Sequence, residues 1–148
     1  MSTNVTATIE IAATPERVWA VLTDLASYTQ WNPVFCGASG QLAVGNRITL
    51  TTTQPANGRT MNVKVKVLAV EPATELRWIS RVLGISTSKR SFLLSRDGGG
   101  TELRQTGTYE GLFTRFPPKT INSIETSFEA INQAVKEQAE ALQRAASD

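Results

Sequence analysis

Three polar side chains occupy positions where the local strand pattern calls for apolar residues. Arg90, Gln105 and Tyr109 lie in two β-type segments, 87–95 and 101–110, on the more apolar face of each segment. An arginine on such a face is a permanently charged fork that can hold a carboxylate or polarise a carbonyl group. A glutamine amide can orient a ligand, and a tyrosine hydroxyl can share that role. These three side chains are therefore candidate contacts for a bound molecule.

Each of the three side chains also has a purely structural explanation. An arginine near a strand end commonly extends its guanidinium to water or pairs with a glutamate. A buried glutamine is commonly satisfied by neighbouring backbone groups, and a tyrosine has the same two options. The sequence leaves both explanations open for Arg90, Gln105 and Tyr109.

The residues that common catalytic mechanisms require are missing. The chain has no histidine and a single cysteine, Cys36, so no histidine base can activate a serine or thiol nucleophile. The absence of histidine also removes the usual ligand of zinc, copper and iron. We therefore assign no catalytic residue, no metal ligand and no cofactor. General acid–base chemistry by Asp24, Tyr109 or Glu110 stays open.

The composition limits which classes of protein and which kinds of partner are expected. The chain has 148 residues, of which 41% are hydrophobic and 19% charged, as expected for one soluble globular domain over residues 1–148. A formal net charge of +2 is too small to supply affinity for nucleic acid. The N-terminus lacks a secretion signal and no apolar run is long enough for an integral membrane segment, so we expect a cytoplasmic protein. Homo-oligomerisation remains open.

The first third of the chain predicts one strand and two helices. Residues 4–11 alternate polar with apolar side chains, as in a half-buried strand. A helix over 14–25 follows, because Thr14 can cap it and Pro15 suits its first position. A second, shorter helix is expected over 27–32, where the following proline forces an extended conformation.

The middle of the chain predicts a series of strands, and the end predicts a long helix. The strand-type runs are 34–39, 46–54, 60–70, 75–83, 87–95 and 101–110. From Pro117 onward, apolar residues recur every three or four positions over about 28 residues. This order predicts an α+β fold: a curved antiparallel sheet of about seven strands, wrapped around the C-terminal helix, with two short helices after strand 1.

Three segments have a recognisable pattern: TPERVWAVLTDLASYTQWNP at 14–33, ELRWIS at 75–80, and LLSRDGGGTELRQTGTYEG ahead of the long helix. Together they resemble the START-like (helix-grip, SRPBCC) superfamily and, within it, the polyketide cyclase/dehydrase and lipid-transport group. The resemblance spans nearly the whole chain and implies the same helix-grip fold. In members with known ligands, the cavity lies between the concave sheet face and the C-terminal helix, with its mouth near the loops and the short second helix. The family hosts many roles, so it implies a cavity without naming a substrate.

Aromatic residues are expected to line such a cavity. The resemblance places Trp31 and Phe35 near its mouth, although Trp31 can equally pack the second helix onto the sheet. The alternation of the strands places Trp78 and Phe92 on the inward face. Phe128 falls on the apolar stripe of the long helix, where it can form part of a cavity wall or of a filled core. Together with the three polar candidates, these five form the predicted ligand-binding set.

The opposite face of the predicted sheet carries many cations. The outward positions hold Lys64, Lys66, Arg77, Arg81 and Arg104, opposed by Glu75 and Glu102. This pattern is typical of a solvated convex surface. It also fits a docking face for an acidic partner or an anionic membrane.

The sequence leaves three candidate functions open. The favoured one is non-catalytic binding or transport of a small apolar molecule such as a lipid, polyketide, quinone or aromatic compound. The second is a polyketide cyclase or dehydrase that uses Arg90, Gln105 and Tyr109. The third is a protein-interaction module of the heat-shock-ATPase-activator type, acting through the convex face.

Overall fold

The computed structural model describes residues 2–53, 58–82, 86–111 and 117–147. Its elements run in the order β1 (Ser2–Ile11), α1 (Pro15–Thr23), a 3-10 turn η1 (Leu25–Ser27), α2 (Tyr28–Trp31), β2 (Phe35–Ser39), β3 (Arg47–Thr53), β4 (Thr60–Glu71), β5 (Glu75–Val82), β6 (Ser86–Asp97), β7 (Gly100–Glu110) and α3 (Pro118–Ser147). Every element expected from the sequence is present, with ends shifted by at most three residues. The predicted fold class is confirmed.

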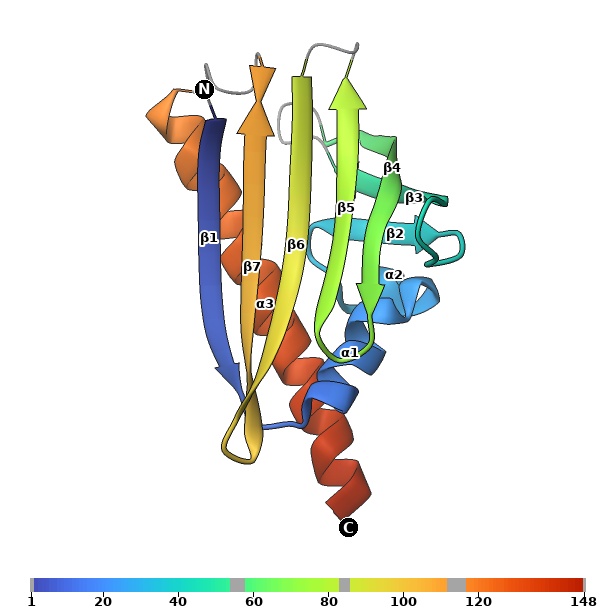
Figure 1. Cartoon of the computed structure of the whole chain (residues 1–148), viewed down its shortest axis with the longest axis vertical. Coiled ribbons are helices and arrows are strands. Elements are labelled where there is room, and N and C mark those ends of the chain that lie inside the picture. The colour runs from blue at the N-terminus through green and yellow to red at the C-terminus, as the bar shows by residue number, and fades with distance from the viewer. Residues whose placement is uncertain (1, 54–57, 83–85, 112–116, 148) are drawn as a thin grey trace.

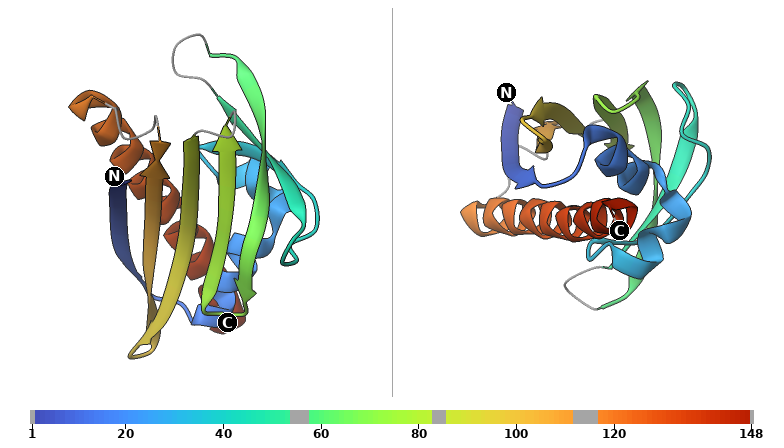
Figure 2. Two further views of the ribbon diagram at one scale, coloured as in Figure 1. Left: turned by 45° about the horizontal axis from the view of Figure 1, so that its top comes forward. Right: turned by 90° about the horizontal axis from the view of Figure 1, so that it is seen from below.

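The seven strands form one antiparallel sheet in the order β1-β7-β6-β5-β4-β3-β2. Figure 1 shows α3 running diagonally behind the sheet, with α1 and α2 beside the lower ends of the strands. Seen from below, the strands curve around one side of α3 (Figure 2). Because the sheet is curved, its inner face and the helix enclose the interior of the molecule.

The start of α1 follows from its capping residues. The Thr14 hydroxyl accepts a hydrogen bond from the Arg17 amide at 3.3 Å, and Pro15 occupies the first helical position. Glu16 lies in the first turn, where its charge meets the positive end of the helix dipole. The residues Val18, Val21 and Leu22 then fall on the buried side of α1.

The apolar stripe of α3 packs on the inner face of the sheet. Phe128, Ile131, Val135 and Ala139 are each at most 1% exposed. Leu142 also follows the helical spacing, but it is 46% exposed. The last turns of α3 extend past the lower ends of the strands, so they have no sheet to cover them (Figure 1).

A glycine on β7 lets α3 approach the sheet closely. Gly107 lies opposite Val5 of β1 and Arg90 of β6 in the strand register. A Cβ atom at this position would lie 2.7 Å from Cζ of Phe128 and 3.1 Å from the Tyr109 ring. The Phe128 ring therefore occupies the space that a side chain at position 107 would need.

We predict that Gly107→Ala destabilises the protein. The added methyl group overlaps a fully buried ring, and such overpacking costs about 1–3 kcal/mol. Thermal unfolding should therefore occur several degrees lower than in the wild type. Gly99→Ala is the control, because a Cβ atom there meets no atom within 4 Å. Equal melting temperatures for the two variants would contradict the close approach.

The Glu140 carboxylate on α3 links the helix to the end of β1 through hydrogen bonds. Oε2 of Glu140 accepts hydrogen bonds from the Ala12 amide at 2.8 Å and from Nζ of Lys136 at 2.6 Å. Nζ of Lys136 also donates to the Glu10 carbonyl at 3.0 Å. The hydrogen bond from Lys136, followed by the one from Ala12, lowers the pKa of the Glu140 carboxyl below its usual value.

We predict that Glu140→Gln weakens the dependence of the free energy of unfolding on pH in the acid range. A carboxyl whose pKa is lower in the folded state stabilises the fold above its unfolded pKa of about 4.3. That contribution is lost as the pH falls through the lower, folded pKa. Urea unfolding near neutral pH should give the variant a lower free energy of unfolding than the wild type. This difference should disappear in strong acid. A constant difference between wild type and variant at all pH values would contradict this linkage.

Candidate functional site

A cavity of about 200 Å³ lies on the inner face of the sheet. Its wall takes residues from every strand from β2 to β7. The described lining consists of Phe35, Leu50, Val63, Val65, Trp78, Ser80, Ser88, Lys89, Arg90 and Tyr109. Four of the predicted ligand-binding residues, Phe35, Trp78, Arg90 and Tyr109, therefore meet at one cavity.

The aromatic residues of this region form a connected cluster. The ring centroids of Phe35 and Trp78 are 6.2 Å apart, and those of Trp78 and Phe92 are 5.4 Å apart. Phe92 is only 2% exposed and belongs to the core. The structure thus places Phe92 behind Trp78, where it supports the cavity wall without being among the described residues that line it.

The guanidinium of Arg90 lies between two aromatic rings. Its Cζ atom is 4.3 Å from the centroid of Phe128 and 5.0 Å from that of Phe35. These are cation–π distances, at which the ring faces attract the positive charge. Phe128 is itself fully buried, so it forms a support beneath the cation.

The hydrogen-bonding partners of Arg90 among the described residues are neutral. Nη1 donates to Oε1 of Gln105 at 3.1 Å, and a further hydrogen bond joins the guanidinium to the Tyr109 side chain. Burial lowers the pKa of Arg90, and the interaction with Tyr109 opposes that shift. The group nevertheless stays charged, because arginine does not lose its proton in proteins. No described residue forms an ion pair with it.

Gln105 fixes the position of Arg90 through hydrogen bonds. Its side chain is fully buried, and Nε2 donates to the Phe128 carbonyl at 3.1 Å and to Oδ1 of Asn132 at 2.9 Å. With the bond accepted from Arg90, the amide has partners at both ends. Gln105 is thus a positioning residue that links β6, β7 and α3, and it is not among the described residues that line the cavity.

Asn132 is a member of this network that the sequence analysis missed. It is 2% exposed and lies four residues after Phe128 on the same helical face. A polar residue between Ile131 and Val135 in the apolar stripe was the available signal. Its meaning depends on Gln105, which is distant in sequence.

Trp31 lies away from the cavity. Its ring packs edge-on against Tyr28 with centroids 5.1 Å apart, and it lines a separate groove formed by α1, η1, α2 and the C-terminal half of α3. The Tyr28 hydroxyl donates to the Leu22 carbonyl, and burial raises the pKa of this phenol. The short helix α2 therefore turns Trp31 toward other helices.

A second, larger groove lies near the first turns of α3. It has a volume of about 410 Å³, and its described lining comprises Pro33, Val34, Thr52, Thr53, Thr120, Ser123, Ile124 and Ser127. Val34 precedes Phe35, which lines the cavity, and Thr52 pairs with Phe35 across β2 and β3. The groove and the cavity thus share a border on β2.

Two features that would suggest other chemistry are absent from the parts of the chain that the structure describes. No group of three or more His, Cys, Asp or Glu side chains there is arranged to hold a metal ion. No helix there has the length and apolar character needed to cross a bilayer. The cavity is therefore lined by aromatic and aliphatic residues, by Ser80 and Ser88, and by two basic residues, Lys89 and the aromatic-flanked Arg90.

The curved sheet, the long C-terminal helix and the cavity between them define a helix-grip protein of the START-like type. The sequence matches the family described as polyketide cyclase / dehydrase and lipid transport over residues 2–146. The chain belongs to this family, as its resemblance indicated. Among curated proteins, none matches the sequence.

Solved structures share this fold at low sequence identity. A START superfamily protein from Mycobacterium smegmatis superposes with a TM-score of 0.76 at 20% identity, covering 94% of this chain and 98% of that one. Ara h 8.0201 gives a TM-score of 0.75 at 14% identity, covering 95% and 99%. The di-domain ARO/CYC StfQ from the steffimycin biosynthetic pathway gives 0.73 at 10% identity, covering 99% of this chain and 52% of that chain. At these identities the likeness concerns the fold alone.

We predict that Gln105→Ala destabilises the fold by about 2–3 kcal/mol, because it leaves buried polar groups of Arg90 and Asn132 without their partner. Denaturant unfolding measures the change. Thr106→Ala, on the outer face of the same strand, should cost at most about 1 kcal/mol. If the two variants were equally stable, Gln105 would not have the structural role described here.

Proposed function

We propose that the protein binds a small aromatic or aliphatic molecule that carries a carboxylate or another electron-rich oxygen, in the cavity at Arg90. The observation that carries this proposal is a guanidinium at the wall of a cavity with Phe35, Trp78 and aliphatic side chains, for which the described residues supply no ion-pairing carboxylate. Membership of a family described by polyketide cyclization and lipid transport supports an apolar ligand.

The size of the cavity favours a compact ligand. Sites for drug-sized molecules usually enclose about 300–1,000 Å³. The cavity at Arg90 encloses about 200 Å³, which suits a molecule of one or two rings or a short acyl chain. The bordering groove near Val34 and Ile124 offers a path for access and room for a longer tail.

The charge of the cavity favours an acidic ligand. Placing a cation on an apolar wall is unfavourable unless it is paired. Here Phe35, Phe128, Gln105 and Tyr109 solvate the guanidinium only in part. A ligand carboxylate would complete its coordination through the two parallel hydrogen bonds that arginine forms with this group.

Holding the ligand is favoured over transforming it. The chain has no histidine, and among the described residues the Cys36 thiol lies within hydrogen-bonding distance of the Thr51 carbonyl and the Thr53 hydroxyl. The alternative, cyclization or dehydration of a polyketide-like substrate, rests on Tyr109, whose hydroxyl lies beside Arg90 at the cavity. Such an enzyme would use Arg90 to polarise a carbonyl and Tyr109 to move a proton.

We predict that the wild-type protein binds 2-naphthoate at least about tenfold more tightly than its neutral amide, a difference of about 1.4 kcal/mol that one charge-assisted contact supplies. Isothermal titration with the two compounds measures this preference. Arg90→Met keeps a long side chain over the Phe128 ring but removes the charge, so the variant should lose the preference.

The control for this experiment is Arg104→Met, which makes the same charge change on the outer face of β7. It should keep the preference for the acid. Native mass spectrometry before and after organic extraction adds a search for a co-purified ligand. The proposal fails if neither compound binds and no ligand co-purifies, or if Arg104→Met and Arg90→Met lower the affinity equally.

A further inference from the structure

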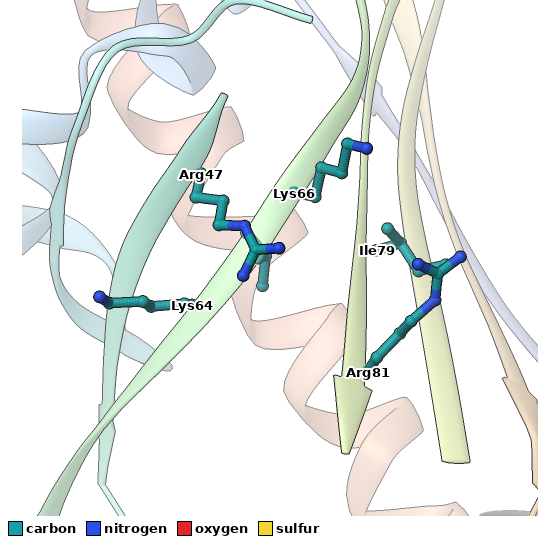
Figure 3. A pocket seen from close by; sticks show the side chains of 6 residues that line it. Arg47, Lys64, Lys66, Ile79 and Arg81 are labelled. Carbon is teal, nitrogen blue, oxygen red and sulfur yellow. The ribbon is translucent and has the colours of Figure 1, made fainter. Parts of the chain in front are cut away.

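The outer face of the sheet carries a cluster of cations that form no ion pair within the part of the chain that the structure describes. Arg47, Lys64, Lys66 and Arg81 surround a hollow of about 90 Å³ whose remaining lining is Val65 and Ile79. Figure 3 shows these cations arising from three neighbouring strands, β3, β4 and β5. We name these four residues the basic patch.

The strand register places like charges next to one another. Arg47 lies directly opposite Lys66, and Lys66 lies opposite Ile79, which in turn lies opposite Lys89. Directly opposed like charges destabilise a sheet. A surface that served only solubility would be expected to alternate the two signs here.

The rest of the same face does alternate them. Arg77 forms an ion pair with Glu75 at 2.7 Å, and Arg104 approaches Glu102 at 3.7 Å. Within the described residues, no member of the basic patch has a carboxylate within ion-pairing distance. The unpaired charge is therefore concentrated on β3 to β5, with Lys89 of β6 beside it, and does not extend over the whole face.

We propose that the basic patch is a docking site for an extended acidic segment of a partner protein. This surface lies on the face of the sheet opposite the ligand cavity, so the proposal does not depend on the function proposed above. Three features of the basic patch favour a peptide as the partner: the directions of its side chains, the chemistry of the hollow and the distribution of charge over the face.

The directions of the side chains favour an extended partner. In Figure 3, Lys64 points away from Lys66, and the head groups of Arg47 and Arg81 lie over different strands. The four head groups do not converge on one point, as they would around a single phosphate. Lys64 and Lys66 are two residues apart on β4, a spacing of about 7 Å that matches alternate side chains of an extended peptide.

The chemistry of the hollow favours a peptide with an apolar side chain among its acids. Ile79 faces outward between Lys66 and Lys89, and it is only 7% exposed. The aliphatic parts of long basic side chains commonly cover such a residue while their charges stay in water. A peptide can present both groups, whereas a phosphate backbone offers only charge.

The distribution of charge disfavours a membrane or a nucleic acid. The lower end of the same outer face carries Glu10, Glu71, Glu75 and Glu102 at outward strand positions. An extended anionic surface that covered the face would meet these acids as well as the basic patch. A short acidic segment meets only the cations.

The test uses the full chain and a fluorescein-labelled peptide in which glutamate and serine alternate around one central valine. Fluorescence anisotropy should show binding at low salt that weakens as salt rises, since exposed charge pairs are screened. The variant K64E/K66E should bind about tenfold more weakly, because two charge attractions are removed and two repulsions are added.

The control variant K119E/R144E makes the same change in net charge on exposed positions of α3 and should bind like the wild type. K64Q/K66Q removes charge without adding repulsion, and thermal unfolding confirms that each variant is folded. Vesicles containing phosphatidylserine and a short DNA duplex complete the set of ligands.

Three results would overturn the proposal. The first is the absence of salt-sensitive peptide binding by the wild type. The second is an equal loss of binding in K119E/R144E, which would indicate a bulk charge effect. The third is tighter binding of the vesicles or the duplex than of the peptide through the same lysines, which would assign the basic patch to that other partner.

Discussion

The contact between Phe128 of α3 and Gly107 of β7 sets how closely the helix approaches the sheet, and the cavity depends on that distance. Because Gly107 has no side chain, the Phe128 ring lies against β7 next to Arg90, which occupies the opposite position on β6. The guanidinium then lies over this ring at 4.3 Å. A larger residue at position 107 would move the support on which the cation rests.

A buried polar network complements this apolar contact. Gln105 bonds simultaneously to Arg90, to Asn132 and to the Phe128 carbonyl, so one amide joins two strands and the helix. Buried polar groups are tolerated only when their hydrogen bonds are satisfied, which makes such a network sensitive to geometry. The same geometry that satisfies Gln105 keeps the Arg90 charge at the cavity wall. The stability of the fold and the proposed ligand binding therefore depend on the same residues.

The two faces of the sheet carry unpaired positive charge for different reasons. On the inner face, aromatic rings and neutral hydrogen-bond acceptors hold a single guanidinium in a confined space. On the outer face, the basic patch lies in water, where its charges are screened and repel one another only weakly. Val65 of β4 borders both sites, so a single strand separates the ligand cavity from the proposed docking surface.

The order of elements, the curled sheet and the inward positions of Trp78 and Arg90 could be derived from the sequence, because strand and helix periodicity depend on near neighbours along the chain. The cationic outer face followed from the same alternation. The roles of Gln105 and Asn132 could not be derived from the sequence, since they depend on how the helix aligns with a strand 27 residues earlier. Trp31 likewise packs on Tyr28 because of the local turn of α2, which periodicity over four residues does not determine. Tertiary packing alone decided which inward side chains meet at a cavity and which fill the core.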